Sequence, residues 1–196
     1  MPTPKRPKPR LTPPRADALS PAQKELRDAI ARGPRAGFTM SGPFAIWMEA
    51  PEYGKLAQAL GGFVRYQTSL EPRLSELAIL CTARHWRAQY EWTAHAPIAE
   101  AAGVKAATIR AIRAGRRPAG APKDELAVYD FARGLYRDRR VSDAAYKKVH
   151  AILGNRGTVE LVGILGYYAT VAMMLDVFRA AIDPSEELPF REPVPA

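Results

Sequence analysis

The 196-residue sequence contains one cysteine, Cys81, and no long hydrophobic run. A single cysteine excludes an intrachain disulfide and fits a reducing compartment. The basic residues at the N-terminus are not followed by an apolar stretch, so a secretory signal is not supported. The longest uncharged apolar run, residues 161–175, is shorter than the roughly 20 residues that a helix needs to cross a bilayer. We therefore expect a soluble cytoplasmic protein without a membrane partner.

Acidic residues are missing from the first 15 positions, which carry five lysines and arginines. Of the formal net charge of +9, this segment supplies +5 and leaves +4 for the rest of the chain. Hydrophobic residues at 47% and charged residues at 25% are typical of a soluble globular domain. Because the basic excess lies mainly in a terminal segment, we expect no specific nucleic-acid partner for the folded part.

Proline is concentrated at the two ends, where ten of the 18 prolines fall within residues 1–14 or 184–195. Proline removes a backbone donor and interrupts helices, so both ends are expected to lie extended over the surface or to be disordered. The sequence thus predicts a basic, proline-rich tail at 1–19, one domain at 20–183 and a second tail at 184–196. The first tail suits a polyproline ligand or a weak polyanion contact, but a solubilising role is the simpler interpretation.

The internal prolines and glycines mostly mark helix boundaries, and no alternating apolar run long enough for a sheet is present. Ser20-Pro21 has the pattern of a helix start, Gly154 that of a stop, and Thr158 that of a second start. The sequence predicts an all-α domain. Its helices are expected at about 21–32, 44–49, 52–66, 73–87, 89–101, 105–114, 124–137, 143–153 and 159–182.

The last predicted helix, 159–182, is apolar nearly all round. Such a helix must be covered on most sides, and burying one large aliphatic side chain contributes roughly 1.5–3 kcal/mol. In a domain of this size, part of that cover is expected from another copy of the chain. We therefore predict a homo-oligomer.

The stretch from Glu76 to His95 carries most of the potential chemistry. Glu91 and His95 are four positions apart, so on a helix they share a face with Cβ atoms roughly 6 Å apart. Glu76 lies 19 positions before His95, roughly 28 Å along an uninterrupted helix. Glu76 and His95 can meet within one chain only if it reverses direction between them, and residues 86–89 are the plausible place.

The order Glu76, then Tyr90-Glu91-Trp92, then His95 resembles the carboxymuconolactone decarboxylase family, whose relatives include the alkylhydroperoxidase D-type proteins. The segments 76–80 and 166–173 are also similar to that family, and the resemblance covers about residues 38–182. It implies a compact fold of antiparallel helices, a homo-oligomeric assembly, and a glutamate and a histidine that face one pocket.

In that pocket His95 would be the general acid/base, since an imidazole titrates near neutral pH. Glu91 or Glu76 would orient the imidazole, and the sequence leaves open which of the two does so. Tyr90 and Trp92 would wall the pocket and restrict water. An ordinary surface ion pair between Glu91 and His95 is the alternative.

The resemblance implies decarboxylation, without a cofactor, of a small carboxylated lactone or unsaturated acid. Arg84 and Arg87 are candidates to bind the substrate carboxylates, because guanidinium groups bind carboxylates bidentately. For both arginines, a solvated charge on a helix is the competing interpretation.

Two other activities are less well supported by the sequence. Thiol peroxidases of the related branch have a Cys-x-x-Cys pair where this chain has Ala88 and Glu91, and Cys81 lies alone on an apolar helical face. A metal site built from His85 with the candidate glutamates and His95 lacks any recognised ligand spacing. A non-catalytic binding protein on the same scaffold is the remaining alternative.

Overall fold

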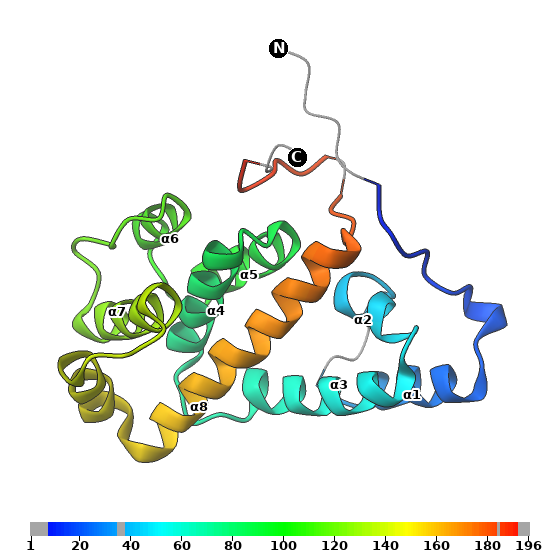
Figure 1. Cartoon of the computed structure of the whole chain (residues 1–196), viewed down its shortest axis with the longest axis horizontal. Coiled ribbons are helices and arrows are strands. Elements are labelled where there is room, and N and C mark those ends of the chain that lie inside the picture. The colour runs from blue at the N-terminus through cyan, green and yellow to red at the C-terminus, as the bar shows by residue number, and fades with distance from the viewer. Residues whose placement is uncertain (1–7, 35–37, 184, 192–196) are drawn as a thin grey trace, which may run out of the picture.

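The computed structural model describes residues 8–34, 38–183 and 185–191, and these residues contain helices but no strand (Figure 1). This confirms the predicted all-α class. The elements are a 3-10 turn η1 (Ala16–Ala18) and the helices α1 (Pro21–Ala31), α2 (Gly42–Trp47), α3 (Pro51–Tyr66), α4 (Pro72–Trp86), α5 (Gln89–Ala101), α6 (Ala106–Arg113), α7 (Lys123–Asp138) and α8 (Asp143–Phe178).

The first four helices begin where proline predicts. Proline occupies the first or second position of α1, α2, α3 and α4, where its missing N–H leaves no hydrogen bond unmade. At α1, the Ser20 hydroxyl accepts from the Gln23 amide (3.3 Å), and the Gln23 side chain accepts from the Ser20 amide (2.9 Å). This reciprocal pair is a capping box.

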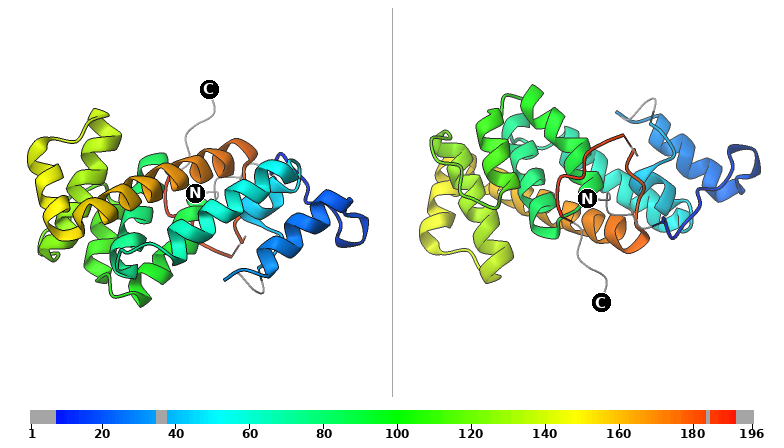
Figure 2. Two further views of the ribbon diagram at one scale, coloured as in Figure 1. Left: turned by 90° about the horizontal axis from the view of Figure 1, so that it is seen from below. Right: turned by 90° about the horizontal axis from the view of Figure 1, so that it is seen from above.

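Helix α4 lies at the centre of the domain. Ten of its fifteen residues are buried, and it packs against α5, α7 and α8. Leu77, Ile79 and Leu80 are completely enclosed. Each such side chain contributes roughly 1.5–3 kcal/mol on burial, so α4 holds its neighbours in place. Figure 2 shows α8 running along α3 in the views from below and from above.

The chain reverses between α4 and α5 without a glycine or proline. Arg87 adopts the left-handed conformation (φ 55°, ψ 32°). The amide of Ala88 donates to the Ala83 carbonyl (2.9 Å), and that of Arg87 donates to the Arg84 carbonyl (3.3 Å). These two bonds form a Schellman motif with arginine at the usual glycine position. The reversal is therefore where the sequence suggested, at residues 86–89.

Helix α8 consists of two helical segments separated at Gly154, where φ is 65° and ψ is −171°. The predicted stop at Gly154 is confirmed. The helix resumes directly after this residue, so the predicted cap at Thr158 is wrong; its hydroxyl instead donates to the Gly154 carbonyl (2.6 Å). The predicted end at 182 is also wrong, because Arg179 turns left-handed and closes the helix at Phe178.

By length and composition, α8 is the single helix in the described residues that could cross a bilayer. The same properties fit the core helix of a globular domain. Helices α2, α3, α4 and α7 all pack against α8, and Leu161, Ile164 and Leu165 are completely enclosed. These contacts identify α8 as a core helix of this domain.

Parts of both predicted tails lie extended against the helices. The backbone of Arg10 donates to the Phe178 carbonyl (3.0 Å) at the end of α8. Near the other end, the Gln89 side chain makes two hydrogen bonds with the backbone of Phe190, which is buried. The rest of the two predicted tails, residues 1–7, 184 and 192–196, lies outside the described residues.

The Gly154 conformation leads to a stability prediction. A Cβ at position 154 meets no neighbouring atom, but the backbone adopts a region that is essentially reserved for glycine. Gly154→Ala should lower the free energy of unfolding by about 1–3 kcal/mol. Gly62→Ala is the matched control, since position 62 lies inside α3 with equal space and should be neutral or stabilising by up to about 1 kcal/mol. Urea denaturation measures the free energy of unfolding of both variants. If both substitutions changed it equally, Gly154 would not be required by its backbone conformation.

Candidate active site

Glu76 and His95 meet in the interior. Glu76 projects from α4 and His95 from α5, and Nδ1 of the imidazole lies 2.7 Å from Oε2 of the carboxylate. Both residues are buried, with 6% and 5% of their surfaces exposed. The reversal at Arg87 produces this contact, because it folds α5 back along α4. Glu76, and not Glu91, is therefore the hydrogen-bond partner of His95.

The imidazole of His95 is held in a neutral state with a defined tautomer. Burial lowers the pKa of His95, and the hydrogen bond and charge of Glu76 offset this only partly. When the Glu76 carboxylate is ionised, Nδ1 carries the proton and donates it to that bond. Nε2 then has a free lone pair and can accept a proton. The ring of Tyr168, from α8, packs edge-on against the imidazole at 5.1 Å between ring centroids.

Glu91 lies one helical turn before His95 and is 2% exposed. Neither of its carboxyl oxygens has a hydrogen-bond partner among the described residues. Burial raises the pKa of Glu91 well above its usual value, and the negative charge of Asp176 adds to the shift. A carboxylic acid in such surroundings keeps its proton near neutral pH and can act as a proton donor.

Two further polar residues near His95 and Glu91, Arg65 and Tyr136, were not predicted from the sequence. Arg65 on α3 is half-buried, and its positive charge contributes, behind burial, to the lowered pKa of His95. Tyr136 on α7 donates to the Leu165 carbonyl (2.9 Å) and is hydrogen-bonded to the hydroxyl of Thr82 (2.8 Å). That network ties α7 and α8 to α4. Both residues come from other helices, so no local sequence pattern connects them to the 76–95 stretch.

Comparison with known proteins agrees with this arrangement. Residues 51–133, which include Glu76, Glu91 and His95, match the model of the carboxymuconolactone decarboxylase family. Over this segment, which is less than half of the chain, the sequence is similar to the carboxymuconolactone decarboxylase family. No curated protein matches the sequence.

Among solved structures, a protein of unknown function from Agrobacterium tumefaciens has a similar fold. It has been suggested to be an antioxidant defence protein AhpD. The similarity has a TM-score of 0.64, covers 72% of this chain and 97% of the other, and has 19% sequence identity. At that identity the similarity establishes the helical fold.

The aromatic residues on either side of Glu91 point to different neighbours. The hydroxyl of Tyr90 is hydrogen-bonded to Ser41 (3.2 Å), and its ring fills the space above Gly42. Trp92 is buried against the ring of Phe190, 5.2 Å between centroids. Tyr90 therefore packs α5 against the start of α2, and Trp92 packs it against the C-terminal segment.

The two candidate substrate-binding arginines, Arg84 and Arg87, lie in different surroundings. Arg87 is exposed and donates to the Arg191 carbonyl (2.9 Å). Arg84 lies beside the ring of Phe190, with 5.6 Å from Cζ to the ring centroid, and lines a surface pocket with Cys81.

His85 is exposed and stacks on Tyr136. No group of three or more potential metal-ligating side chains occurs within the described residues.

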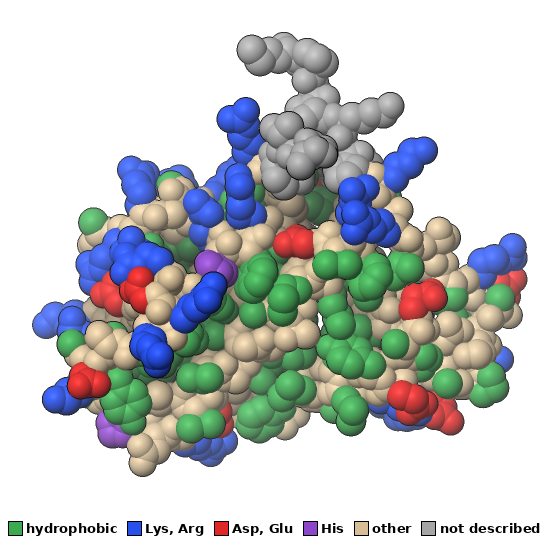
Figure 3. Space-filling view, viewed as in Figure 1, with side chains coloured by type: hydrophobic (Ala, Val, Ile, Leu, Met, Phe, Trp, Pro, Cys, Tyr) green, Lys and Arg blue, Asp and Glu red, His purple; other side chains and the backbone are tan. Residues whose placement is uncertain are grey.

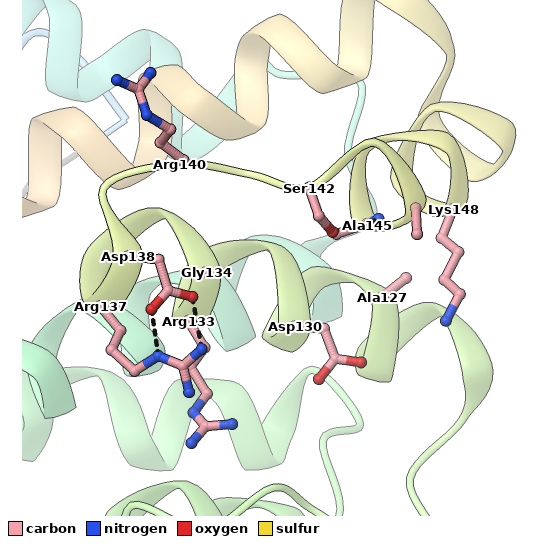
Figure 4. Close-up of a pocket in the computed structure, with 11 residues that line it drawn as sticks. Ala127, Asp130, Arg133, Gly134, Arg137, Asp138, Arg140, Ser142, Ala145 and Lys148 are labelled. Carbon is pink, nitrogen blue, oxygen red and sulfur yellow. Dashed lines mark hydrogen bonds and ion pairs between the residues drawn. The ribbon is translucent and has the colours of Figure 1, made fainter.

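A larger pocket, of about 270 Å³, lies between α7 and the first segment of α8 (Figure 4). Its wall mixes acidic and basic side chains, including Asp130, Arg133 and Lys148, and Arg137 is paired with Asp138. None of the residues that line it comes from the Glu76–His95 site. Glu76, Glu91 and His95 form a separate, buried cluster in the single chain.

The neutral state of Glu91 predicts a specific pH dependence of stability. Above pH 4.5 the unfolded carboxyl is ionised while the folded one keeps its proton, so the folded state binds more protons and its stability falls as pH rises. Glu91→Gln removes this contribution. The variant should therefore gain stability relative to the wild type between about pH 5 and pH 8.

Urea denaturation at several pH values measures this difference. Glu100→Gln, an exposed position on the same helix, is the control and should track the wild type. His95 affects both proteins alike, since its lowered pKa reduces stability only as pH falls below about 6.5. A pH-independent difference between Glu91→Gln and wild type would mean that Glu91 is ionised in the folded protein.

Proposed function

We propose that this protein is a cofactor-independent acid–base enzyme of the carboxymuconolactone decarboxylase type. Its substrate would be a small carboxylated lactone or a related unsaturated acid. The observation that carries the proposal is the buried 2.7 Å Glu76–His95 hydrogen bond one helical turn from the unpartnered acid of Glu91. A neutral acid and a neutral base in one apolar interior are the two groups that proton-transfer catalysis needs.

Decarboxylation consumes one proton. The bond between the substrate carbon and its carboxylate breaks, the electron pair moves into the conjugated carbonyl system, and CO₂ leaves. Glu91 then delivers its proton to the resulting carbanion or dienolate carbon and is reprotonated from water. His95, oriented by Glu76, accepts a proton at Nε2 in any step where the substrate must lose one, such as isomerisation of the double bond.

The substrate carboxylate needs a cation close to these groups. Among the arginines, Arg65 is the one whose charge acts on both His95 and Tyr168. It lies on α3, is half-buried, and has no ion pair with a described carboxylate. We assign it the carboxylate-binding role that the sequence suggested for Arg84 and Arg87. The cytoplasm, where a single unpaired cysteine stays reduced, is the expected compartment.

A thiol peroxidase is the second candidate, because the Agrobacterium protein of the same fold is linked by name to antioxidant defence. In this chain Cys81 is buried, and burial raises the pKa of its thiol. A thiol that does not ionise is a poor nucleophile, and there is no second cysteine to resolve an oxidised intermediate. These observations favour the acid–base mechanism.

Turnover of a panel of carboxylated lactones tests the mechanism. Glu91→Gln and His95→Gln should each lower kcat by about 10²–10⁴-fold. Cys81→Ser should leave kcat unchanged. Unaltered turnover in His95→Gln would remove the proposed mechanism. Hydroperoxide reduction that disappears in Cys81→Ser would establish the peroxidase, and binding of the lactones without turnover would indicate a non-catalytic protein.

We also propose that the enzyme works as a homo-oligomer. Figure 3 shows hydrophobic side chains gathered on the face formed by α3 and α8. On α3 the exposed residues Leu56, Leu60 and Phe63 repeat at helical spacing; on α8, Val159 and Val162 do the same and are followed by further exposed apolar residues. Two adjacent apolar stripes facing water are typical of an interface between subunits.

The oligomer prediction is tested by light scattering after size-exclusion chromatography at micromolar concentration. The wild type should elute as an oligomer, and the double variant Leu60→Glu/Val159→Glu should be monomeric because it places charges in both stripes. Ile152→Glu is the control, since Ile152 is an exposed apolar residue on the other segment of α8. A monomeric wild type would contradict the prediction.

A further inference from the structure

A second surface pocket, of about 230 Å³, lies between α4, α7 and the turn after α6. Glu76, Glu91 and His95 are not among the residues that line it. Cys81 and Arg84 line it from α4, Gly115 from the turn, and Tyr129 and Arg133 from α7. Its volume is below the roughly 300–1,000 Å³ typical of pockets for drug-sized ligands, so it suits a small molecule.

Arg84 is held in this pocket by its surroundings. Its Nε is buried and has no hydrogen-bond partner. The ring of Phe190 lies beside its guanidinium, and a Cβ at position 115 would come within 2.8 Å of Nη2. Glycine at 115 therefore allows the close approach of the turn to the guanidinium. A buried N–H of a charged group without an acceptor is costly, and an anion in the pocket would at least balance the charge of the guanidinium.

The wall of the pocket carries positive charge that nearby acids do not neutralise. Arg133 has no ion pair with a described carboxylate. Of the acids on α7, Asp130 is paired with Arg117 (2.8 Å), and Asp138 is paired with Arg137 (2.6 Å), which also lines the pocket. Arg84 likewise has no carboxylate partner among the described residues. Of the three arginines that line the pocket, Arg84 and Arg133 thus lack a carboxylate partner among the described residues, an arrangement that attracts a negatively charged ligand.

We propose that this pocket binds a small oxyanion, a carboxylate or a phosphate group, with Arg84 as the principal ligand and Arg133 as the second. A guanidinium matches both oxyanions bidentately. The rings of Tyr129 and Tyr136, which also line the pocket, suit the apolar part of a small organic acid. The ligand is independent of the proposed catalysis, because none of Glu76, Glu91, His95 and Arg65 lines this pocket.

Isothermal titration of the full-length protein at low ionic strength tests the proposal, with sodium phosphate and sodium benzoate as separate probes. Binding of either probe to the wild type supports an oxyanion site. The probe that binds more tightly shows whether the site prefers a phosphate group or an organic carboxylate. Arg84→Gln should weaken binding about tenfold or more. Arg110→Gln, which removes the same charge from an exposed position on α6, should bind like the wild type.

Two further variants separate binding from folding. Arg133→Gln changes an exposed side chain and should weaken binding severalfold without affecting the thermal unfolding curve. His95→Gln should leave binding intact, so a failure of the proposed catalysis does not affect this result. Equal binding by Arg84→Gln and Arg110→Gln, or no binding of either probe at millimolar concentration, would overturn the proposal. Binding of a DNA duplex alone would also overturn it, since it would indicate a general basic surface.

Discussion

The hydrogen bond between Glu76 and His95 is the contact on which the site depends, and it exists because the chain reverses at Arg87 and Ala88. In a continuous helix the two residues would be roughly 28 Å apart. Folded back, α5 lies along α4 and the two groups satisfy one another in the core. A buried carboxylate without such a partner would be expensive, so the reversal, the packing of α5 and the polar pair are mutually required.

The break at Gly154 determines how α8 packs against the Glu76–His95 pair. It separates α8 into a segment beside α7 and a second segment that runs along α3 and α4. The second segment brings Tyr168 against the imidazole and lets Leu165 accept a hydrogen bond from Tyr136. Glu160 of the same segment accepts from Ser69 at the end of α3 (2.6 Å). The neutral state of the buried groups thus depends on how α8 is placed, since burial is the main cause of both pKa shifts.

Sequence patterns located most helix starts, because proline has a direct local meaning at a first turn. Helix ends were harder to predict. Arg87, Arg139 and Arg179 adopt positive φ values where glycine is usual, at a cost of about 1–2 kcal/mol each. No glycine or proline marks these ends; those of α4 and α7 still lie within one residue of the expected ones, whereas the predicted end at 182 was wrong. The break at Gly154 was predictable because glycine does stand there.

Within the site, sequence spacing could place Glu91 and His95 on one face, but it could not choose the partner of the histidine. The choice depends on how α5 is rotated against α4, which is a property of tertiary packing. The directions of Arg84 and Arg87 were equally hidden. Both occur at the end of α4, and the ring of Phe190, from the far end of the chain, lies beside only one of them. Arg65 was missed because α3 has no motif in common with the 76–95 stretch.

Desolvation by the same helical core has opposite consequences for a thiol and for a carboxylic acid. A thiol must ionise to attack a peroxide, and burial opposes that ionisation, as at Cys81. A carboxylic acid must keep its proton to donate it near neutral pH, and burial favours the protonated form, as at Glu91. By its resemblance to the peroxidase branch, this chain has glutamate where those relatives have the second cysteine of their pair. Under the proposed function, the absence of both cysteines, at Ala88 and Glu91, goes with proton transfer in place of redox chemistry, and the Glu76–His95 pair serves as the oriented base.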